Sequence, residues 1–337
     1  MKAMRVNAPM RIEDLALKNI SKPKLRTGEV RVSLQAVSLN HRELLILKGT
    51  WPQWGTFTLG SDGCGVVCEV DKDVEKVQVG DDVIIYPGLQ WGLEPNFPGL
   101  TFNTLGGPSD GTFADSVVIP AENVFLRPTY LTCEESAALP VASISAFRAL
   151  VKRASIAAGE TLLVHGIGGG LAQAGMLIAQ AIGAKVIVTS SSDSKLARAR
   201  EMGAAHGINY STTNWCTEVE GFTNGVGPDV ILDCVGGETL ALSVESVRVG
   251  GRIVSVGVTT GATCHFPIRA LFVRHVNLYG TSLGSPWEFS DMLKFFSHHR
   301  LHPILHDVYR FGDITSAMRV LERGEQFGKI VLRVTET

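Results

Sequence analysis

The sequence predicts an α/β protein in which a doubly wound parallel sheet is inserted into a β-rich module. First, the apolar run 161–164 leads through a glycine-rich turn into the amphipathic segment 173–183, and a second apolar run, 185–189, follows at once. A strand, helix and strand of about 30 residues form a dinucleotide-binding unit. Second, further strand candidates follow in the same rhythm, at 206–210, 229–235, 251–258 and 276–283. Third, residues 1–127 show short alternating strands separated by turns.

The length of 337 residues suits two domains. We expect residues 1–127 and 285–337 to form the β-rich domain, and residues 128–284 to form the nucleotide-binding domain. In the first domain the pattern predicts a helical patch at 38–48 and strands at 29–38, 63–70, 82–86 and 112–119. Helical patterns at 132–140 and 143–153 lead into the nucleotide-binding unit, and 286–298 follows it. The tail is too short to fold alone, so we expect it to return to the first domain, through segments 307–310, 314–323 and 329–334.

Composition excludes several classes of protein. Hydrophobic residues make up 45%, charged residues 19%, and the net charge is −2, so nothing points to nucleic acid or an anionic membrane as a partner. No apolar run approaches the roughly 18 residues of a membrane-spanning helix, and residues 1–10 lack a signal-peptide core. The six cysteines form no C-x-x-C pair, which argues against a structural zinc site. We therefore expect a cytoplasmic protein.

The glycine-rich turn occupies residues 165–172 and departs from the literal G-x-G-x-x-G pattern. Gly166 and Gly169 are followed by Ala172, a small residue where a helix must pack on a strand. Glycines let the backbone approach a pyrophosphate, and the helix that follows offers free N–H groups and the positive end of its dipole. The alternative is a plain strand–turn–helix junction that needs a positive φ angle.

The end of the second strand favours NADP over NAD. An NAD site usually carries an acidic residue there for the ribose hydroxyls. This chain has Ser190 within a Thr-Ser-Ser-Ser run, and Lys195 lies on the next helix. Hydroxyls and cations suit a 2′-phosphate, and no carboxylate repels it. The alternative is that Ser192 or Asp193 caps a helix whose basic residues are solvated.

Motifs along nearly the whole chain resemble those of the medium-chain dehydrogenase/reductase superfamily, in its zinc-free, quinone-oxidoreductase-like and zinc-type alcohol dehydrogenase-like branch. The motifs are Gly28-Glu29-Val30, Gly60-Ser61-Asp62-Gly63, Val79-Gly80-Asp81, Gly111-Thr112-Phe113-Ala114, Glu134–Pro140, Leu163-Val164-His165-Gly166, Ile208-Asn209-Tyr210, Gly250-Gly251-Arg252 and Phe327–Leu332. The resemblance implies a GroES-like catalytic domain interrupted by a Rossmann domain, with the active site in the cleft between them.

The same resemblance locates the zinc ligands of metal-using members, and this chain lacks them. Asn40 stands at the position of a cysteine ligand, Ser61-Asp62 at that of a histidine-glutamate pair, and the third ligand falls near Val141. The four-cysteine structural loop is absent from residues 87–110. An amide, a hydroxyl and an apolar side chain do not make a zinc site, so we expect no bound metal.

Without zinc, the expected reaction is hydride transfer from NADPH to a quinone or an α,β-unsaturated carbonyl. The alternatives are alcohol or aldehyde oxidoreduction, and a nucleotide-binding protein without turnover. The candidate catalytic residues are Asn40, His41 and Arg42. Asn40 is the preferred donor to a substrate or nicotinamide oxygen, with a helix N-cap as its alternative. His41 is a proton donor or a structural histidine, and Arg42 is a pyrophosphate contact or a solvated helix residue.

The resemblance also assigns cofactor-binding residues. Lys195 and Tyr210 match residues near the adenosine phosphate, where Ser190 replaces the usual acid. The pyrophosphate is expected against the glycine-rich turn, at His165, Gly166, Gly169, Gly170 and Leu171. The nicotinamide side is expected at the ends of two strands, at Val235, Gly236, Val256 and Gly257. Ordinary turns at strand ends are the alternative for the last group.

Two expectations concern surfaces. The substrate pocket is expected to be built from loop residues such as Trp51, Trp54, Trp91 and Phe97, with 87–110 as a long surface loop. Segment 276–283 is predicted as the edge strand of the parallel sheet, which in resembling proteins pairs with its twofold mate. We therefore expect a homodimer, in which Tyr279→Pro would remove a donor from the ladder. The alternative is a monomer whose edge is shielded by segment 259–270.

Overall fold

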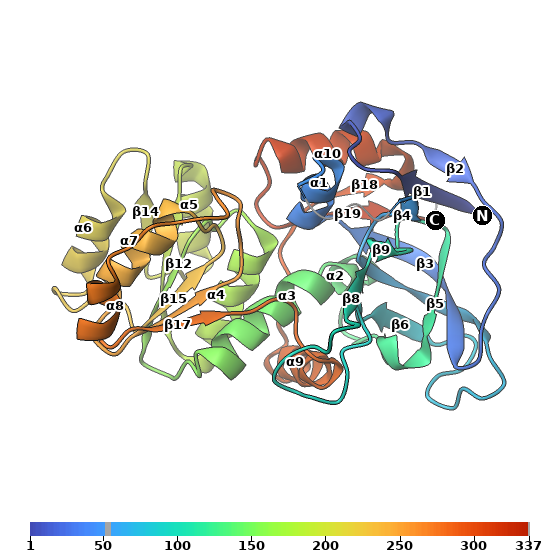
Figure 1. The fold of residues 1–337 in the computed structure, drawn as a ribbon, viewed down its shortest axis with the longest axis horizontal. Helices are drawn as coiled ribbons and strands as arrows, with labels where there is room; N and C mark the ends of the chain where they lie inside the picture. The colour runs from blue at the N-terminus through green and yellow to red at the C-terminus, as the bar shows by residue number, and fades with distance from the viewer. Residues whose placement is uncertain (51–54, 336–337) are drawn as a thin grey trace. The chain divides into compact units, whose positions relative to one another are not determined.

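The computed structural model describes residues 1–50 and 55–335, and it divides into two compact units (Figure 1). Unit 1 comprises Met1–Ile144 and Gly284–Thr337, and unit 2 comprises Ser145–Leu283. Residues 128–144 thus group with unit 1, whereas the sequence placed them in the nucleotide-binding domain.

A seven-stranded sheet forms the centre of unit 1, in the order β11-β6-β5-β3-β19-β18, with β10 also paired to β3. The C-terminal tail returns to this sheet, because β19 runs antiparallel to β3 and places Val331 opposite Ser38. The strand expected at 112–119 begins later, since Thr112 and Phe113 instead donate their N–H groups to Gly60 and Leu59. The strands are β3 (Glu29–Ser38), β5 (Asp62–Val70), β6 (Asp82–Ile85), β10 (Ser116–Pro120), β11 (Val124–Leu126), β18 (Leu305–Arg310) and β19 (Lys329–Arg333).

Two small sheets complete the strands of unit 1. Residues 87–110 contain one of them, and Trp91 is 3% exposed with its ring edge-on to Phe102 at 5.2 Å. Trp91 therefore anchors this segment instead of lining an open pocket, whereas Phe97 is exposed. Trp51 and Trp54 lie outside the described residues. The small sheets consist of β1 (Lys2–Val6), β2 (Leu17–Asn19) and β4 (Phe57–Thr58), and of β7 (Gly88–Leu89), β8 (Asn103–Leu105) and β9 (Pro108–Ser109).

The helices of unit 1 cover the sheet and explain the boundary at residue 144. Thr132 caps α2, and Ala137 and Ala138 pack against Ala36, Cys64 and Val331 of the sheet. This apolar contact holds residues 128–144 in unit 1. The helix expected at 132–140 ends at Ala137, and α3 begins at Pro140, a residue favoured in a first helical turn. The helices are α1 (His41–Leu47), α2 (Cys133–Ala137), α3 (Pro140–Phe147, which runs into unit 2), α9 (Pro286–His299) and α10 (Ile314–Glu322).

Unit 2 is built on a six-stranded parallel sheet in the order β14-β13-β12-β15-β16-β17. In chain order this is 3-2-1-4-5-6, the doubly wound Rossmann arrangement, so the predicted fold class is confirmed. The order reverses on either side of β12, and ligands bind such sheets beyond the carboxyl ends of the strands at that point. The strands are β12 (Thr161–Val164), β13 (Lys185–Ser190), β14 (His206–Asn209), β15 (Val230–Asp233), β16 (Arg252–Ser255) and β17 (Asn277–Gly280).

Helices cover both faces of this sheet. Leu163, Ile187 and Ile231 form one apolar layer with residues of α6, α7 and α8. On α4, a Cβ atom at Gly175 would lie 2.5 Å from Leu232, so the missing side chain lets this helix pack closely on β15. No helix within residues 1–50 and 55–335 has the length and apolarity to cross a bilayer. The helices are a π-helical turn (Arg148–Arg153), α4 (Gly170–Ile182), α5 (Asp193–Glu201), α6 (Trp215–Phe222), α7 (Glu238–Ser246) and α8 (Ile268–Val273).

Candidate functional site

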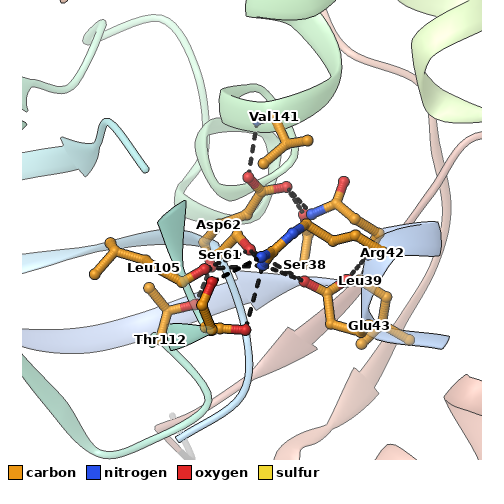
Figure 2. A network of polar contacts seen from close by, with 12 residues as sticks. Ser38, Leu39, Arg42, Glu43, Ser61, Asp62, Leu105, Thr112 and Val141 are labelled. Atoms are coloured by element: carbon orange, nitrogen blue, oxygen red, sulfur yellow. Dashed lines mark hydrogen bonds and ion pairs between the residues drawn. The ribbon is translucent and has the colours of Figure 1, made fainter. Parts of the chain in front are cut away.

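A largely buried polar cluster lies where β3 ends and α1 begins, around Ser38 and Asp62 (Figure 2). It also contains Asn40 and Lys329, and we call these four residues the Asp62 cluster. Strand pairing sets Asp62 opposite Ser38. The Oδ2 atom of Asp62 accepts hydrogen bonds from Ser38 Oγ at 2.8 Å, Asn40 Nδ2 at 2.8 Å and Lys329 Nζ at 3.0 Å. Its Oδ1 atom accepts from the backbone N–H of Val141 at 2.9 Å. The carboxylate is therefore fully engaged, although it is 0% exposed.

Lys329 supplies the positive charge of this cluster. Its Nζ atom donates to Leu39 O at 2.6 Å and to Asn40 Oδ1 at 2.5 Å, as well as to Asp62. These three bonds use all three protons of the ammonium group. Sequence reasoning missed this residue, although Lys329 opens a strand whose next three residues are buried and apolar. A lysine in such a strand needs a buried partner, and that was the available signal.

Arg42, Glu43 and Ser61 form a second buried group beside the first (Figure 2). The Arg42 guanidinium donates to Ser61 Oγ and to the carbonyl oxygens of Leu105, at 2.9 Å, and Gly107, at 3.3 Å. Arg42 therefore clamps the turn between β8 and β9, and is neither a solvated helix residue nor an available anion contact. The Glu43 carboxylate accepts from Ser61 Oγ at 3.2 Å and from Asn40 N at 2.6 Å.

The pKa of Glu43 is raised to about 7, first because burial removes its carboxylate from water and then because Asp62 adds negative charge. Arg42 and Lys329 oppose this shift. The two buried groups together contain two cations and two carboxyls, so their charges nearly balance. Such a closed arrangement holds the start of α1 in a fixed position.

The three catalytic candidates occupy different environments. Asn40 is the N-cap residue of α1, and its side chain binds Asp62 and Lys329. Its role as a donor to a substrate or nicotinamide oxygen stays a prediction. Arg42 points inward, as described above. His41 lies exposed in the first turn of α1. Of the three, Asn40 is the half-exposed residue whose side-chain amide is held by bonds to both Asp62 and Lys329.

The residues at the zinc-ligand positions do not fit a zinc ion. Val141 contributes only a backbone N–H donor, and Asn40 and Asp62 already bind the Lys329 ammonium. A dication bound to Asn40 Oδ1 and Asp62 Oδ2 would lie against a fixed positive charge. Across the part of the chain that the structure describes, no group of three His, Cys, Asp or Glu side chains could hold a metal ion.

In unit 2 the glycine-rich turn joins β12 to α4 at the reversal of strand order. Gly166 has a φ angle of 73°, which favours glycine, and a Cβ atom there would lie 3.2 Å from Val235. Gly169 is the N-cap of α4, and Gly170 and Leu171 form its first turn, whose N–H groups have no partner within the helix. The turn therefore fits the pyrophosphate of a dinucleotide through its backbone and the helix dipole.

His165 lies in this motif, but its side chain is buried within unit 2. It is 2% exposed, and its two ring nitrogens lie 3.3 Å from Thr189 Oγ1 and 3.2 Å from Ser243 Oγ. Its ring also meets Trp215 edge-on at 4.8 Å. Burial lowers the pKa of His165 to about 3, so the imidazole is neutral. Its side chain links the end of β12 to β13 and α7, and its backbone N–H donates to the Leu232 carbonyl at 3.3 Å.

The candidates for the adenosine end gather at the carboxyl ends of β13 and β14. Ser190 lies opposite Asn209 in the sheet, and its carbonyl accepts from the backbone N–H of Tyr210 at 3.2 Å. The Tyr210 ring is 50% exposed. Ser192 caps α5, because its side chain accepts from Lys195 N at 3.4 Å, so the capping interpretation holds. The same bond fixes the position of the Lys195 backbone in the first turn of α5.

The remaining candidates end β15 and β16. Val235 and Gly236 donate their N–H groups to Asp233 Oδ1 at 3.0 and 2.9 Å. A Cβ atom at Gly257 would lie 2.0 Å from the Cys234 carbonyl oxygen, so only glycine permits this approach of the two strand ends. Val256 precedes it and donates to the Asp233 carbonyl at 2.9 Å. These turns lie at the same edge of the parallel sheet as the glycine-rich turn.

Known proteins resemble the chain over both units. Residues 26–129 match the alcohol dehydrogenase GroES-like domain, and residues 170–298 match the zinc-binding dehydrogenase family. The zinc-type alcohol dehydrogenase-like protein YogA of Leptosphaeria maculans is 34% identical, over 95% of this chain and 94% of its own length. A zinc-type alcohol dehydrogenase-like protein of Schizosaccharomyces pombe is 35% identical, over 92% of each. A solved NAD-dependent alcohol dehydrogenase is 32% identical, with a TM-score of 0.92 over 99% of this chain and 100% of that one.

Proposed function

The chain belongs to the medium-chain dehydrogenase/reductase superfamily of oxidoreductases, and we propose that it transfers hydride from NADPH to a quinone or an α,β-unsaturated carbonyl without zinc. The observation that carries this proposal is the Asp62 cluster. In this cluster the buried ammonium of Lys329 holds the side-chain amide of Asn40. Asn40 stands at the position where zinc-using relatives have a metal ligand.

When bound, the cofactor supplies the hydride that adds to an electron-poor carbon of the substrate. The chain must then stabilise the negative charge that develops on the conjugated oxygen, and Asn40 is the proposed donor to it. A proton must also reach the enolate, or the oxygen of the hydroquinone anion, and exposed His41 or water would deliver it. Alcohol oxidation is disfavoured because residues 1–50 and 55–335 offer no fitting metal site to lower the pKa of an alcohol.

We propose NADPH as the cofactor because the end of β13 lacks an acidic side chain. Ser190 takes the place of that acid, and Lys195 and Tyr210 follow at the same edge of the sheet. A 2′-phosphate would meet a hydroxyl, an ammonium and a phenol there, with no carboxylate at position 190 to repel it. The similar solved structure is that of an NAD-dependent alcohol dehydrogenase, so the cofactor preference of this chain is to be measured.

The deciding experiment measures NADPH and NADH oxidation against a panel of quinones, enones, aldehydes and ketones. Metal content is determined on the same preparation, and activity is measured before and after prolonged chelation. We expect reduction of at least one quinone or enone, no stoichiometric zinc, and no loss on chelation. One tightly held zinc per chain, or turnover confined to simple aldehydes and ketones, would refute the proposal.

We also propose a homodimer formed through unit 2. Within the described residues β17 pairs with β16 on one side, and its Leu278 is 38% exposed. The preceding helix α8 has no fully buried residue, and its Ile268, Phe272 and Val273 are 71%, 63% and 54% exposed. Residues 268–273 therefore leave apolar side chains uncovered shortly before the edge strand in the chain, which supports a partner chain over a shielded edge. Cytoplasmic location stays a prediction.

A further inference from the structure

We infer that Lys329 is a positioning residue for the reduction, whose buried ammonium fixes and polarises the Asn40 amide so that one N–H of that amide binds the substrate oxygen. The inference rests on the proposed function and names the residue through which its donor acts. Lys329 and Asn40 lie 289 positions apart in the chain, and the bond between them is made by the return of β19 to β3.

The cluster permits one orientation of the Asn40 amide. Lys329 Nζ donates to Oδ1 at 2.5 Å, and Nδ2 donates to Asp62 Oδ2 at 2.8 Å. A flipped amide would place N–H groups against the ammonium and the carbonyl oxygen against the carboxylate, and both contacts repel. One Nδ2 proton is therefore engaged by Asp62. The other has no partner among residues 1–50 and 55–335, and Asn40 is half-exposed.

The charge of Lys329 makes that remaining N–H a stronger donor. A hydrogen bond from a cation to the amide oxygen draws electron density from the nitrogen, and bonds in such a chain strengthen one another. The effect is large here because Lys329 is 5% exposed and Asp62 is 0% exposed, so water screens little of the charge. A polarised donor stabilises a developing oxyanion more than a neutral carbonyl, which is the requirement for catalysis.

Lys329 does not act on the substrate itself. Its three protons are held by the Leu39 carbonyl, Asn40 Oδ1 and Asp62 Oδ2. Its effect on the reaction must therefore pass through Asn40, and this distinguishes a positioning residue from a second donor.

A double-mutant cycle tests the inference through kcat. We expect Asn40→Ala to lower kcat about 100-fold and Lys329→Met about tenfold, with the KM for NADPH little changed in both. The double variant should be no slower than Asn40→Ala, because Lys329 acts through the amide that Asn40→Ala removes. The matched control is Arg333→Met, which removes a cation from the same strand where it pairs with Glu134. That control should keep the kcat of the unmutated protein.

A second variant covers the case in which Lys329→Met fails to fold because Asp62 is left as an unpaired buried charge. Lys329→Met combined with Asp62→Asn is neutral. The new amide oxygen can accept from the Val141 N–H, and the new NH2 group can donate to the Ser38 hydroxyl. It should show the same tenfold loss of kcat, and Lys329→Arg, which keeps the charge, should recover part of it. An additive cycle, or an unchanged kcat in the neutral variant, would overturn the inference.

A readout independent of turnover separates this inference from the proposed function. An unmutated protein that binds NADPH but reduces nothing in the panel would refute the proposed function alone. In that case, the protein is labelled with ¹⁵N-asparagine, and the side-chain amide of Asn40 is observed by NMR. Its signals are assigned as those that are lost in Asn40→Ala. The signals should shift in the neutral variant and stay in place in Arg333→Met. Unshifted signals in the neutral variant would overturn the positioning role.

Discussion

The Glu43 carboxyl is 0% exposed, and burial raises its pKa to about 7 from a usual value of 4.5. In the unfolded chain the same group titrates near 4.5, so between these values the folded state binds the extra proton. The contribution of Glu43 to stability is therefore fully present below pH 4.5 and is lost as the pH rises through 7. The difference corresponds to at most about 3 kcal/mol.

Glu43→Gln tests this through thermal unfolding at pH 5.5 and pH 8. Glutamine keeps an acceptor for the Asn40 N–H but cannot ionise, so the Tm of the variant should change less between the two pH values than that of the unmutated protein. Glu288→Gln is the matched control, because Glu288 accepts from the Ser285 N–H at the start of α9 in the same way but is only half-buried. An equal pH dependence of Tm for Glu43→Gln and the unmutated protein would show that Glu43 is ionised throughout.

At the scale of elements, the junction of β13, α5 and β14 sets the expected cofactor preference. Ser192 begins α5 and thereby places Lys195 in its first turn, near the carboxyl ends of two strands. One charge-assisted contact is worth about 1.5–3 kcal/mol. Lys195→Ala should therefore raise the Kd for NADPH roughly tenfold or more and leave the Kd for NADH little changed.

Fluorescence titration of both cofactors measures this effect. Lys185→Ala is the control, since Lys185 is exposed at the opposite end of the same strand, β13, and should leave both affinities unchanged. If Lys195→Ala weakens NADPH and NADH equally, Lys195 does not distinguish the 2′-phosphate, and the preference for NADPH loses its basis.

The same elements show what the sequence could predict. The strands 29–38 and 161–164 were predicted with the bounds that the structure has, because apolar runs bordered by turn residues specify a strand locally. The helix expected from 173 begins at Gly170, because glycines that favour a turn also form the first turn of α4. The strand expected from 112 begins at Ser116, since tertiary bonds to Gly60 and Leu59 hold the preceding residues. Local pattern therefore predicts elements better than it predicts their ends.

The candidate site, too, could be predicted from the sequence only in part. Asn40 was found from a motif position, and the glycine-rich turn from its spacing, because both signals lie within a short stretch of chain. The bond from Lys329 to Asn40 spans 289 positions and depends on how β19 pairs with β3, so no local pattern contains it. The burial of the His165 ring between Thr189 and Ser243 is likewise a consequence of packing.

At the scale of the whole molecule, the open edge of β17 is where a second chain would pair. Asn277 and Thr281 donate their N–H groups to Gly251 and Ser255, on the β16 side. Because N–H directions alternate along a strand, the Tyr279 N–H also faces β16, and that of Leu278 faces the open edge. The expectation that Tyr279→Pro would remove a donor between chains therefore needs correction, since it would break the sheet within one chain.

Leu278→Pro is the variant that fits this geometry. Proline is tolerated in an edge strand where its missing N–H faces outward, so the variant should fold with a Tm close to that of the unmutated protein. It should nevertheless lose dimerisation, because an outward donor is gone and the ring obstructs pairing across the edge. Light scattering at micromolar concentration should give twice the chain mass of 36.2 kDa for the unmutated protein and the single mass for Leu278→Pro.

Tyr279→Pro is the comparison, and it should lower the Tm. A single-chain mass for the unmutated protein, or an intact Leu278→Pro dimer, would show that this edge does not join two chains.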